Sequence, residues 1–214
     1  MKISLLCSSK KHPVVPYLEE WIGKLSCDHE IELVFDKSFL SGGDLLFLVS
    51  CSQIVTKCDR RKYRGCFVLH ASDLPNGRGW SPHVWEIAQG ADKITVSLID
   101  AEDKIDTGKI WKKVSINVPR HALWNEINDL LFKAEIYLID QLIDQIEHIE
   151  PIEQDEFAEA TYFPRRDPRH SRIDPKMSIA SQFDKIRVCD PIRYPAHFSY
   201  RGKKYKLIIE KTDD

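Results

Sequence analysis

The sequence has no long apolar stretch, no closely spaced pair of cysteines and no excess of positive charge. Without a run approaching roughly 18 apolar residues, it contains no candidate for a membrane-spanning helix. The N-terminal stretch MKISLLCSSKKH has too short an apolar run for a signal peptide, and it predicts a first strand instead. We therefore expect a cytoplasmic protein without a membrane partner.

The six cysteines form no C-x-x-C pair, and no set of cysteines and histidines has the spacing of a zinc site. Cys7, Cys51 and Cys66 lie in or beside apolar runs, which favours small buried side chains in a reducing compartment. The chain has 31 Lys and Arg against 33 Asp and Glu, and its formal net charge is -2. A sequence-independent nucleic-acid binder needs a basic excess, so we expect no nucleic-acid partner. From the spacing of the cysteines and histidines we expect no metal.

Up to residue 120, short apolar runs alternate with helical patterns. The runs predict strands at 2–7, 31–35, 44–49, 66–70 and 94–99, and the 3.6-residue patterns predict helices at 16–25, 53–63 and 82–88. Ser81 is the expected N-cap of the third helix, which Gly90 ends. Alternation at 114–118 predicts a further, half-buried strand. This order is typical of an α/β protein with a Rossmann-like, mostly parallel sheet.

The longest helical pattern, at 121–149, is expected to close a first domain of residues 1–150. Residues 151–214 are expected to form a small α+β appendage. It contains a Pro- and Arg-rich stretch at 161–175, a short helix capped by Ser178 and a β-hairpin that turns at Arg201-Gly202. The long helix and the hairpin are candidate surfaces for a homodimer, although each can equally bury its apolar face within the chain.

Two apolar runs lead to ionisable residues. His70 ends the run at 66–70, and Asp106 follows the run at 94–99. Open α/β proteins place their sites at the carboxyl edge of the sheet, where we expect these two side chains to meet. A carboxylate beside an imidazole holds one tautomer and favours a general base. Each residue alone has a structural alternative, as a satisfied histidine or as the first residue of an Asp-Thr-Gly turn.

The residues HASDLP at 70–75, GRG at 77–79 and DTGKI at 106–110 resemble the core of the formyltransferase family. The resemblance covers about residues 44–111. Members of this family pass the formyl group of 10-formyltetrahydrofolate to an amine. The resemblance implies that His70 is the catalytic histidine, that Asp106 is the catalytic aspartate and that no metal takes part.

The sequence departs from the family at Val68, where an asparagine usually precedes the histidine by two residues. That asparagine helps to hold the formyl oxygen, and a donor of this kind typically lowers the barrier by about 2.7–4 kcal/mol. We expect protonated His70, a backbone N–H or, less favourably, Ser72 to replace it. A non-catalytic member that binds folate or sugar nucleotide is the alternative.

The resemblance also implies that the pterin is held mainly by backbone groups at the end of the third strand and in the loop before Asp106. These segments are residues 50–54 and 100–105. The predicted folate-binding residues are Ser50, Cys51, Ser52, Ile54, Asp100, Asp103 and Ile105. The alternative for residues 100–106 is an ordinary exposed acidic loop.

Residues 162–174 are similar to a segment of sugar nucleotide N-formyltransferases, and residues 70–85 are most similar to members of the pseudaminic-acid pathway type. The similarity implies a UDP-linked 4-amino-4,6-dideoxy sugar as acceptor. Arginine suits a diphosphate because its planar fork binds two oxygens at once. The predicted substrate-binding residues are Arg78, Gly79, Trp80, Arg165, Arg166 and Arg172.

Several alternatives remain open at this point. Trp80 can instead pack in the core, and Arg165 and Arg166 can form a solvated basic turn. The acceptor can be a non-sugar amine, and the enzyme can be a formyl-folate hydrolase.

Overall fold

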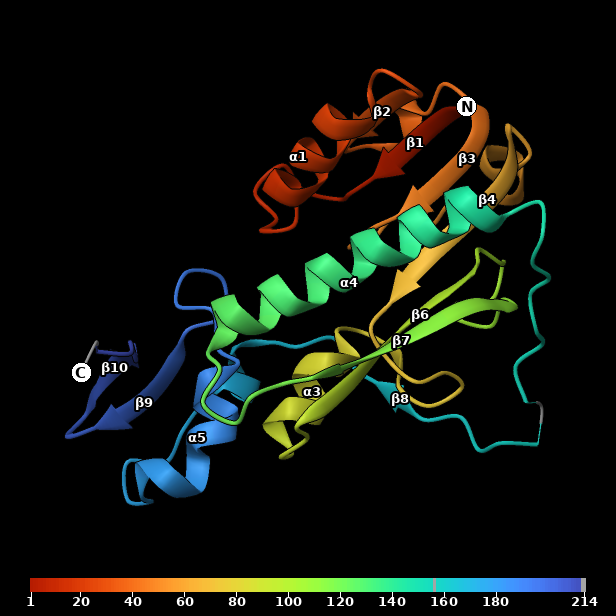
Figure 1. Ribbon diagram of the computed structural model, residues 1–214. Coiled ribbons are helices and arrows are strands. Elements are labelled where there is room, and N and C mark those ends of the chain that lie inside the picture. The colour runs from red at the N-terminus through yellow and green to blue at the C-terminus, as the bar shows by residue number, and fades with distance from the viewer. Residues whose placement is uncertain (156, 213–214) are drawn as a thin grey trace.

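The apolar runs of the first half of the chain form one six-stranded sheet with the order β2-β1-β3-β4-β6-β7 (Figure 1). The computed structural model describes residues 1–155 and 157–212. The strands are β1 (Lys2–Leu6), β2 (Glu30–Val34), β3 (Gly43–Leu48), β4 (Tyr63–His70), β6 (Lys93–Asp100) and β7 (Ile110–Asn117). The first four strands pair in parallel, so their carboxyl ends share one edge of the sheet. The predicted mixed α/β fold with a mostly parallel sheet is confirmed.

Two helices, α1 (Val15–Leu25) and α4 (Trp124–Gln145), pack on one face of this sheet, and α4 crosses the sheet diagonally in Figure 1. Leu18 of α1 and Leu138 of α4 are fully buried against Phe47 of β3. Burial of one such side chain contributes about 1.5–3 kcal/mol. No helix in the described part of the chain combines the length and apolarity that a bilayer crossing requires.

The direction of β6 differs from the expectation. β6 pairs with β4 in antiparallel fashion, with Phe67 opposite Asp100 and His70 opposite Ser97. The connection between the two strands, residues 71–92, contains only the two-residue β5 (Arg78–Gly79) and the seven-residue α3 (Pro82–Ala88) as regular elements. The prediction that both catalytic candidates follow parallel strands is therefore wrong, and Asp106 reaches His70 through the loop after β6.

Two local predictions also need correction. The helix expected at 53–63 is present only as the four-residue α2 (Lys57–Arg60), because the preceding residues form a loop that buries Val55. Ser81 does precede α3, but its backbone is left-handed with φ of 47° and its side chain caps no N–H group. Ser178, in contrast, accepts a hydrogen bond from the Ser181 N–H at the start of α5 (Ile179–Arg187), as predicted.

After α4, the chain runs back past the sheet to β8 and then forms a helix and a hairpin that lie beyond the sheet (Figure 1). β8 (Tyr162–Phe163) pairs in parallel with β5 (Arg78–Gly79). The predicted hairpin is present as β9 (Ala196–Tyr200) and β10 (Lys203–Leu207). Two 3-10 helices, η1 (Lys37–Phe39) and η2 (Pro168–Ser171), complete the described elements. The domain boundary at residue 150 stays a prediction.

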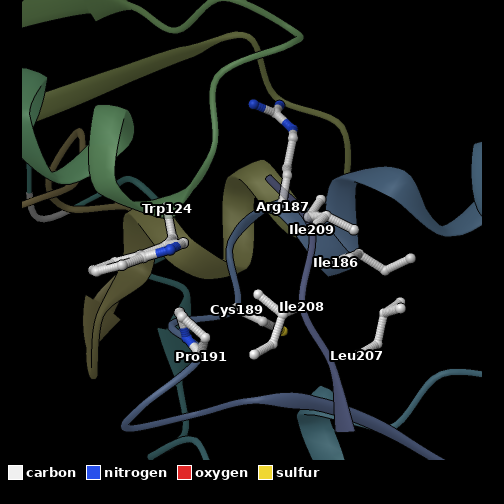
Figure 2. A pocket seen from close by; sticks show the side chains of 8 residues that line it. All are labelled: Trp124, Ile186, Arg187, Cys189, Pro191, Leu207, Ile208 and Ile209. Carbon is white, nitrogen blue, oxygen red and sulfur yellow. The ribbon is translucent and has the colours of Figure 1, made fainter. Parts of the chain in front are cut away.

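A crevice lies where the hairpin and α5 meet the start of α4 (Figure 2). Its wall includes Trp124, Cys189 and Leu207. Its volume is about 10 Å³, about the least that holds one water molecule. We therefore interpret it as a small gap in the packing between the C-terminal elements and α4. The candidate functional site lies at the edge of the sheet.

Candidate active site

His70 is the last residue of β4, and its imidazole is held by the loop that follows. The side chain is 7% exposed. Its Nε2 lies 2.8 Å from the backbone carbonyl of Gly77. Because a carbonyl oxygen can only accept a hydrogen bond, Nε2 must carry the hydrogen. The loop thereby fixes the tautomer and turns Nδ1 toward Asp106.

Asp106 faces that free nitrogen. Its Oδ1 lies 3.5 Å from Nδ1 of His70, and its side chain is 8% exposed. Its Oδ2 accepts a hydrogen bond of 2.8 Å from the backbone N–H of Gly79. The backbone of Asp106 is left-handed with φ of 56°, a conformation that aspartate tolerates better than most residues. The two residues lie close together as expected, and their catalytic roles stay predictions.

This arrangement can move a proton. With Nε2–H bonded to Gly77, the Nδ1 of neutral His70 is free to accept a proton. The Asp106 carboxylate is within ion-pair distance and can stabilise the imidazolium that forms. An oriented imidazole with a carboxylate partner is the usual design of a general base.

Gln154, which the sequence did not suggest, holds the loop that carries Asp106. Its Nε2 donates to the backbone carbonyls of Asp106 at 2.9 Å and of Gly108 at 2.8 Å. Its Oε1 accepts a hydrogen bond of 2.6 Å from Arg78. Gln154 is 7% exposed, so its amide is satisfied entirely within the protein. One polar residue in a segment without periodicity gives no signal of such a role.

Thr161 holds the loop that orients His70, as Gln154 holds the loop that carries Asp106. Its Oγ1 accepts a hydrogen bond of 2.8 Å from the N–H of Gly77. The adjacent Gly79 has φ of 97°, and a Cβ atom there would lie 2.4 Å from the carbonyl oxygen of Phe163. Only glycine permits this close pairing of β5 with β8. Residues 152–155 and 157–163, which we call the strap, therefore contact the loops of both catalytic candidates.

The structure bears on which hydrogen-bond donor replaces the asparagine that the family usually has at the position of Val68. Val68 lies two residues before His70 on the same strand, and it packs in the apolar cluster that includes Cys51 and Ala101. The Nε2–H of His70 is already bonded to Gly77. The Oγ of Ser72 is enclosed and has no partner among the described residues. A backbone N–H is the expected donor that this geometry leaves.

The two segments expected to hold folate lie on the same face of the sheet. Cys51 of one and Ala101 of the other pack in a common apolar cluster. Arg60 ties them together, since it donates to the carbonyl of Val55 at 2.9 Å and to Asp103 at 2.6 Å. This hydrogen bond lowers the pKa of the Asp103 carboxyl.

Both of these segments carry an exposed apolar side chain. Ile54 is 73% exposed and Ile105 is 66% exposed, so each loop presents apolar surface beside its backbone hydrogen-bonding groups. Asp100 instead turns its carboxylate to the Trp111 indole N–H at 2.7 Å, and burial raises its pKa. The Asp100 N–H donates to the carbonyl of Lys109 at 2.9 Å, so the role of Asp100 in folate binding stays a prediction.

Some of the predicted substrate-binding side chains are accessible to a ligand, whereas that of Arg78 is buried. The guanidinium of Arg165 lies 4.9 Å from the ring centre of Trp80, and both side chains are accessible. The expectation for Arg78 needs correction: its guanidinium is buried and donates to Gln154 and to the hydroxyl of Tyr162. Arg78 therefore supports the strap. Arg172 is exposed, and its backbone pairs with His197 of β9.

Comparisons with known proteins identify the family of this chain. Residues 12–142 match the family model described as formyl transferase. Methionyl-tRNA formyltransferase of Bacillus velezensis is 30% identical over 189 residues, which are 86% of this chain and 57% of that protein. The chain thus spans little more than half the length of this relative.

Solved structures give the same fold. A methionyl-tRNA formyltransferase from Clostridium thermocellum superposes with a TM-score of 0.80 and 25% identity, over 99% of this chain and 100% of that one. A sugar N-formyltransferase from a Shewanella species superposes with a TM-score of 0.73 and 13% identity, over 100% and 99% of the two chains. The second similarity concerns the fold alone.

Proposed function

Because this chain belongs to the formyl transferase family, we propose that it transfers the formyl group of 10-formyltetrahydrofolate to the amine of a nucleotide-linked amino sugar. The observation that carries the reaction is the pair formed by His70 and Asp106, with Nδ1 and Oδ1 3.5 Å apart and the tautomer fixed by Gly77. That pair supplies the base that formyl transfer to an amine requires.

The chain's own residues perform the following steps. Residues 50–54 and 100–105 bind the folate, which supplies the formyl group when bound. The acceptor amine, positioned beside Nδ1 of His70, attacks the formyl carbon and gives its proton to Nδ1. The bond from that carbon to the folate nitrogen then breaks, and the nitrogen leaves with a proton, so that tetrahydrofolate and the formylated amine are the products. Asp106 stabilises the imidazolium, and the Gly77 carbonyl keeps the ring from rotating. The near-complete burial of both side chains keeps bulk water from competing for the proton.

The proposed acceptor is a UDP-linked 4-amino-4,6-dideoxy sugar of the pseudaminic-acid type. Support comes from the similarity of residues 162–174 to sugar nucleotide N-formyltransferases. It also comes from the accessible stack of Arg165 on Trp80, which can pack against a nucleotide base or sugar ring. We further propose that the enzyme acts in the cytoplasm.

A second candidate acceptor is the aminoacyl group of an initiator tRNA. The observation in its favour is the 30% identity to the Bacillus methionyl-tRNA formyltransferase. The net charge of -2 argues against it, because an RNA partner is held mainly by cationic side chains.

A coupled assay tests the proposal. The protein is incubated with 10-formyltetrahydrofolate and a panel of UDP- and dTDP-linked 4-amino and 3-amino dideoxy sugars, while absorbance follows tetrahydrofolate and mass spectrometry follows the products. Gain of one formyl group by one sugar supports the proposal. Formate release without an acceptor would indicate a hydrolase, and product formation on methionyl-tRNA alone would replace the sugar by the second candidate.

A further inference from the structure

His83, in α3, carries an imidazole to which the proposed reaction assigns no role. Its Nδ1 is enclosed by protein and has no hydrogen-bond partner among the described residues. Burial, with a smaller effect of neighbouring cationic groups, lowers its pKa to about 3. At neutral pH the ring is therefore uncharged. A proton on the enclosed Nδ1 would be unsatisfied, so the hydrogen of the neutral ring is best placed on Nε2.

Four groups lie close enough for their charges to act on this imidazole: His70, Arg166, His12 and Arg193. They come from four separate segments, namely the end of β4, the stretch after β8, the loop after β1 and the turn after α5. All four are cationic or become cationic when protonated. His12 has its own anchor, since its Nδ1 accepts a hydrogen bond of 3.2 Å from the Val14 N–H.

The two arginines belong to one hydrogen-bonded network. Arg166 donates to Ser171 Oγ at 3.3 Å, and that hydroxyl donates to the carbonyl of Tyr194 at 3.3 Å. The N–H of Tyr194 in turn donates to the carbonyl of Asp190 at 2.9 Å. Arg193 donates from Nε to the Asp190 carboxylate. The network therefore fixes Arg166 and Arg193 relative to each other.

Asp190 is the acid that faces this cluster. Its carboxylate accepts hydrogen bonds from the N–H of Ile192 at 2.8 Å and of Arg193 at 3.1 Å, in addition to that of the guanidinium. These bonds lower the pKa of Asp190 against the effect of burial, and they use its lone pairs. Among the described residues, the terminal nitrogens of Arg193 donate no hydrogen bond, and Arg166 donates from one terminal nitrogen only.

We propose that His83, Arg166 and Arg193 form the subsite for the diphosphate group of the acceptor substrate. The inference deepens the proposed function and rests on it for the identity of the acceptor. The arginines supply the charge and bidentate geometry that phosphate oxygens prefer. His83 donates one further hydrogen bond from Nε2 without adding a charge. Because His70 also neighbours His83, the diphosphate lies beside the reacting amine, and binding it positions that amine.

Titration of the full chain with inorganic pyrophosphate, in the absence of folate and sugar, tests the subsite by calorimetry. We expect wild type to bind and His83→Leu, Arg166→Met and Arg193→Met to bind about tenfold or more weakly, since a hydrogen bond to a charged group typically contributes about 1.5–3 kcal/mol. His83→Gln keeps an N–H near the Nε2 position and should retain binding within about threefold.

Arg169→Ala is the matched control. Arg169 belongs to the same segment, but it pairs with Asp167 and its side chain is 88% exposed, so the variant should bind pyrophosphate like wild type. Absence of binding by folded wild-type protein would overturn the subsite. Equal weakening in Arg169→Ala would also overturn it, and so would unchanged binding in His83→Leu and Arg193→Met.

Competition experiments separate the subsite from the proposed function. Displacement of pyrophosphate by UDP supports a nucleotide-linked acceptor. Displacement by an RNA stem-loop but not by UDP would overturn the diphosphate assignment. If pyrophosphate binds with the expected variant pattern but no formyl transfer occurs in the coupled assay, the subsite stands and the proposed reaction fails.

Discussion

The side-chain amide of Gln154 donates a 2.9 Å hydrogen bond to the backbone carbonyl of Asp106, which lies 48 positions earlier in the chain. A residue of the strap thus holds the loop that carries the proposed catalytic carboxylate. The left-handed backbone of Asp106 needs such support, because few local interactions favour that conformation.

Gln154→Ala removes this support, and we expect kcat to fall about tenfold or more because Asp106 no longer faces His70 in one geometry. The loss of three buried hydrogen bonds should also lower the free energy of unfolding by about 1–3 kcal/mol. Steady-state kinetics and urea unfolding measure the two effects. Gln141→Ala is the control: Gln141 of α4 accepts a hydrogen bond from Lys112 of β7, away from the site, and the variant should leave kcat unchanged.

The second prediction concerns the proton-transfer pair. His70→Asn removes the base, and Asp106→Asn removes the charge that stabilises the imidazolium; each should lower kcat about 10²–10⁴-fold. Because the two residues act as a unit, the double variant should be little slower than the worse single variant. Single-turnover rates measure this, with folate binding as the check on folding. A near-normal rate in His70→Asn would contradict the assignment.

The third prediction concerns the stack of Arg165 on Trp80. Arg165→Ala should raise the KM for the nucleotide sugar several-fold and leave kcat nearly unchanged, because an exposed cation–π contact contributes about 0.5–1 kcal/mol to binding. Arg169→Ala, which removes a neighbouring exposed arginine, should change neither constant. A fall in kcat without a change in KM would argue that Arg165 acts in some other way.

The fourth prediction concerns stability and pH. Glu135 of α4 is 4% exposed, and burial raises the pKa of its carboxyl from 4.5 to about 8. Below pH 4.5 the group is protonated in the folded and unfolded states alike. Between pH 4.5 and 8 it is ionised only in the unfolded state, so its contribution to the free energy of unfolding falls as the pH rises and levels off above pH 8.

Glu135→Gln should abolish that dependence. The variant should match wild type near pH 4.5 and exceed its stability by an amount on the order of a few kcal/mol near pH 8. Urea unfolding of both proteins at pH 5, 7 and 9 measures the difference. A difference that stays constant with pH would show that Glu135 does not titrate in this range.

The sequence pattern was sufficient to predict most of the strands and helices, because apolar periodicity reports which of them are buried. It was also sufficient to predict that His70 and Asp106 lie close together. It was insufficient for the direction of β6, which depends on the path of residues 71–92 and not on any residue within the strand. Asp106 was expected beside His70 by a route that the chain does not take.

The side-chain hydrogen bonds that hold the loops of the site were harder to predict, for a different reason. Arg78 lies between two glycines and suggested a ligand contact, yet its partners Gln154 and Tyr162 are more than seventy positions away. A side-chain hydrogen bond across such a distance leaves no periodic trace in the sequence. The same holds for His83, whose basic neighbours, two arginines and two histidines, come from four separate segments.

The strap has a consequence for the order in which the protein becomes active during its synthesis. A ribosome has made both His70 and Asp106 long before it reaches Gln154 and Thr161, which hold the loops around them. The sheet can assemble while the chain is still growing, but the loops around the proposed catalytic pair gain these hydrogen bonds only after residue 161 has emerged. A nascent chain that stalls near residue 150 would carry a formed sheet and an idle histidine.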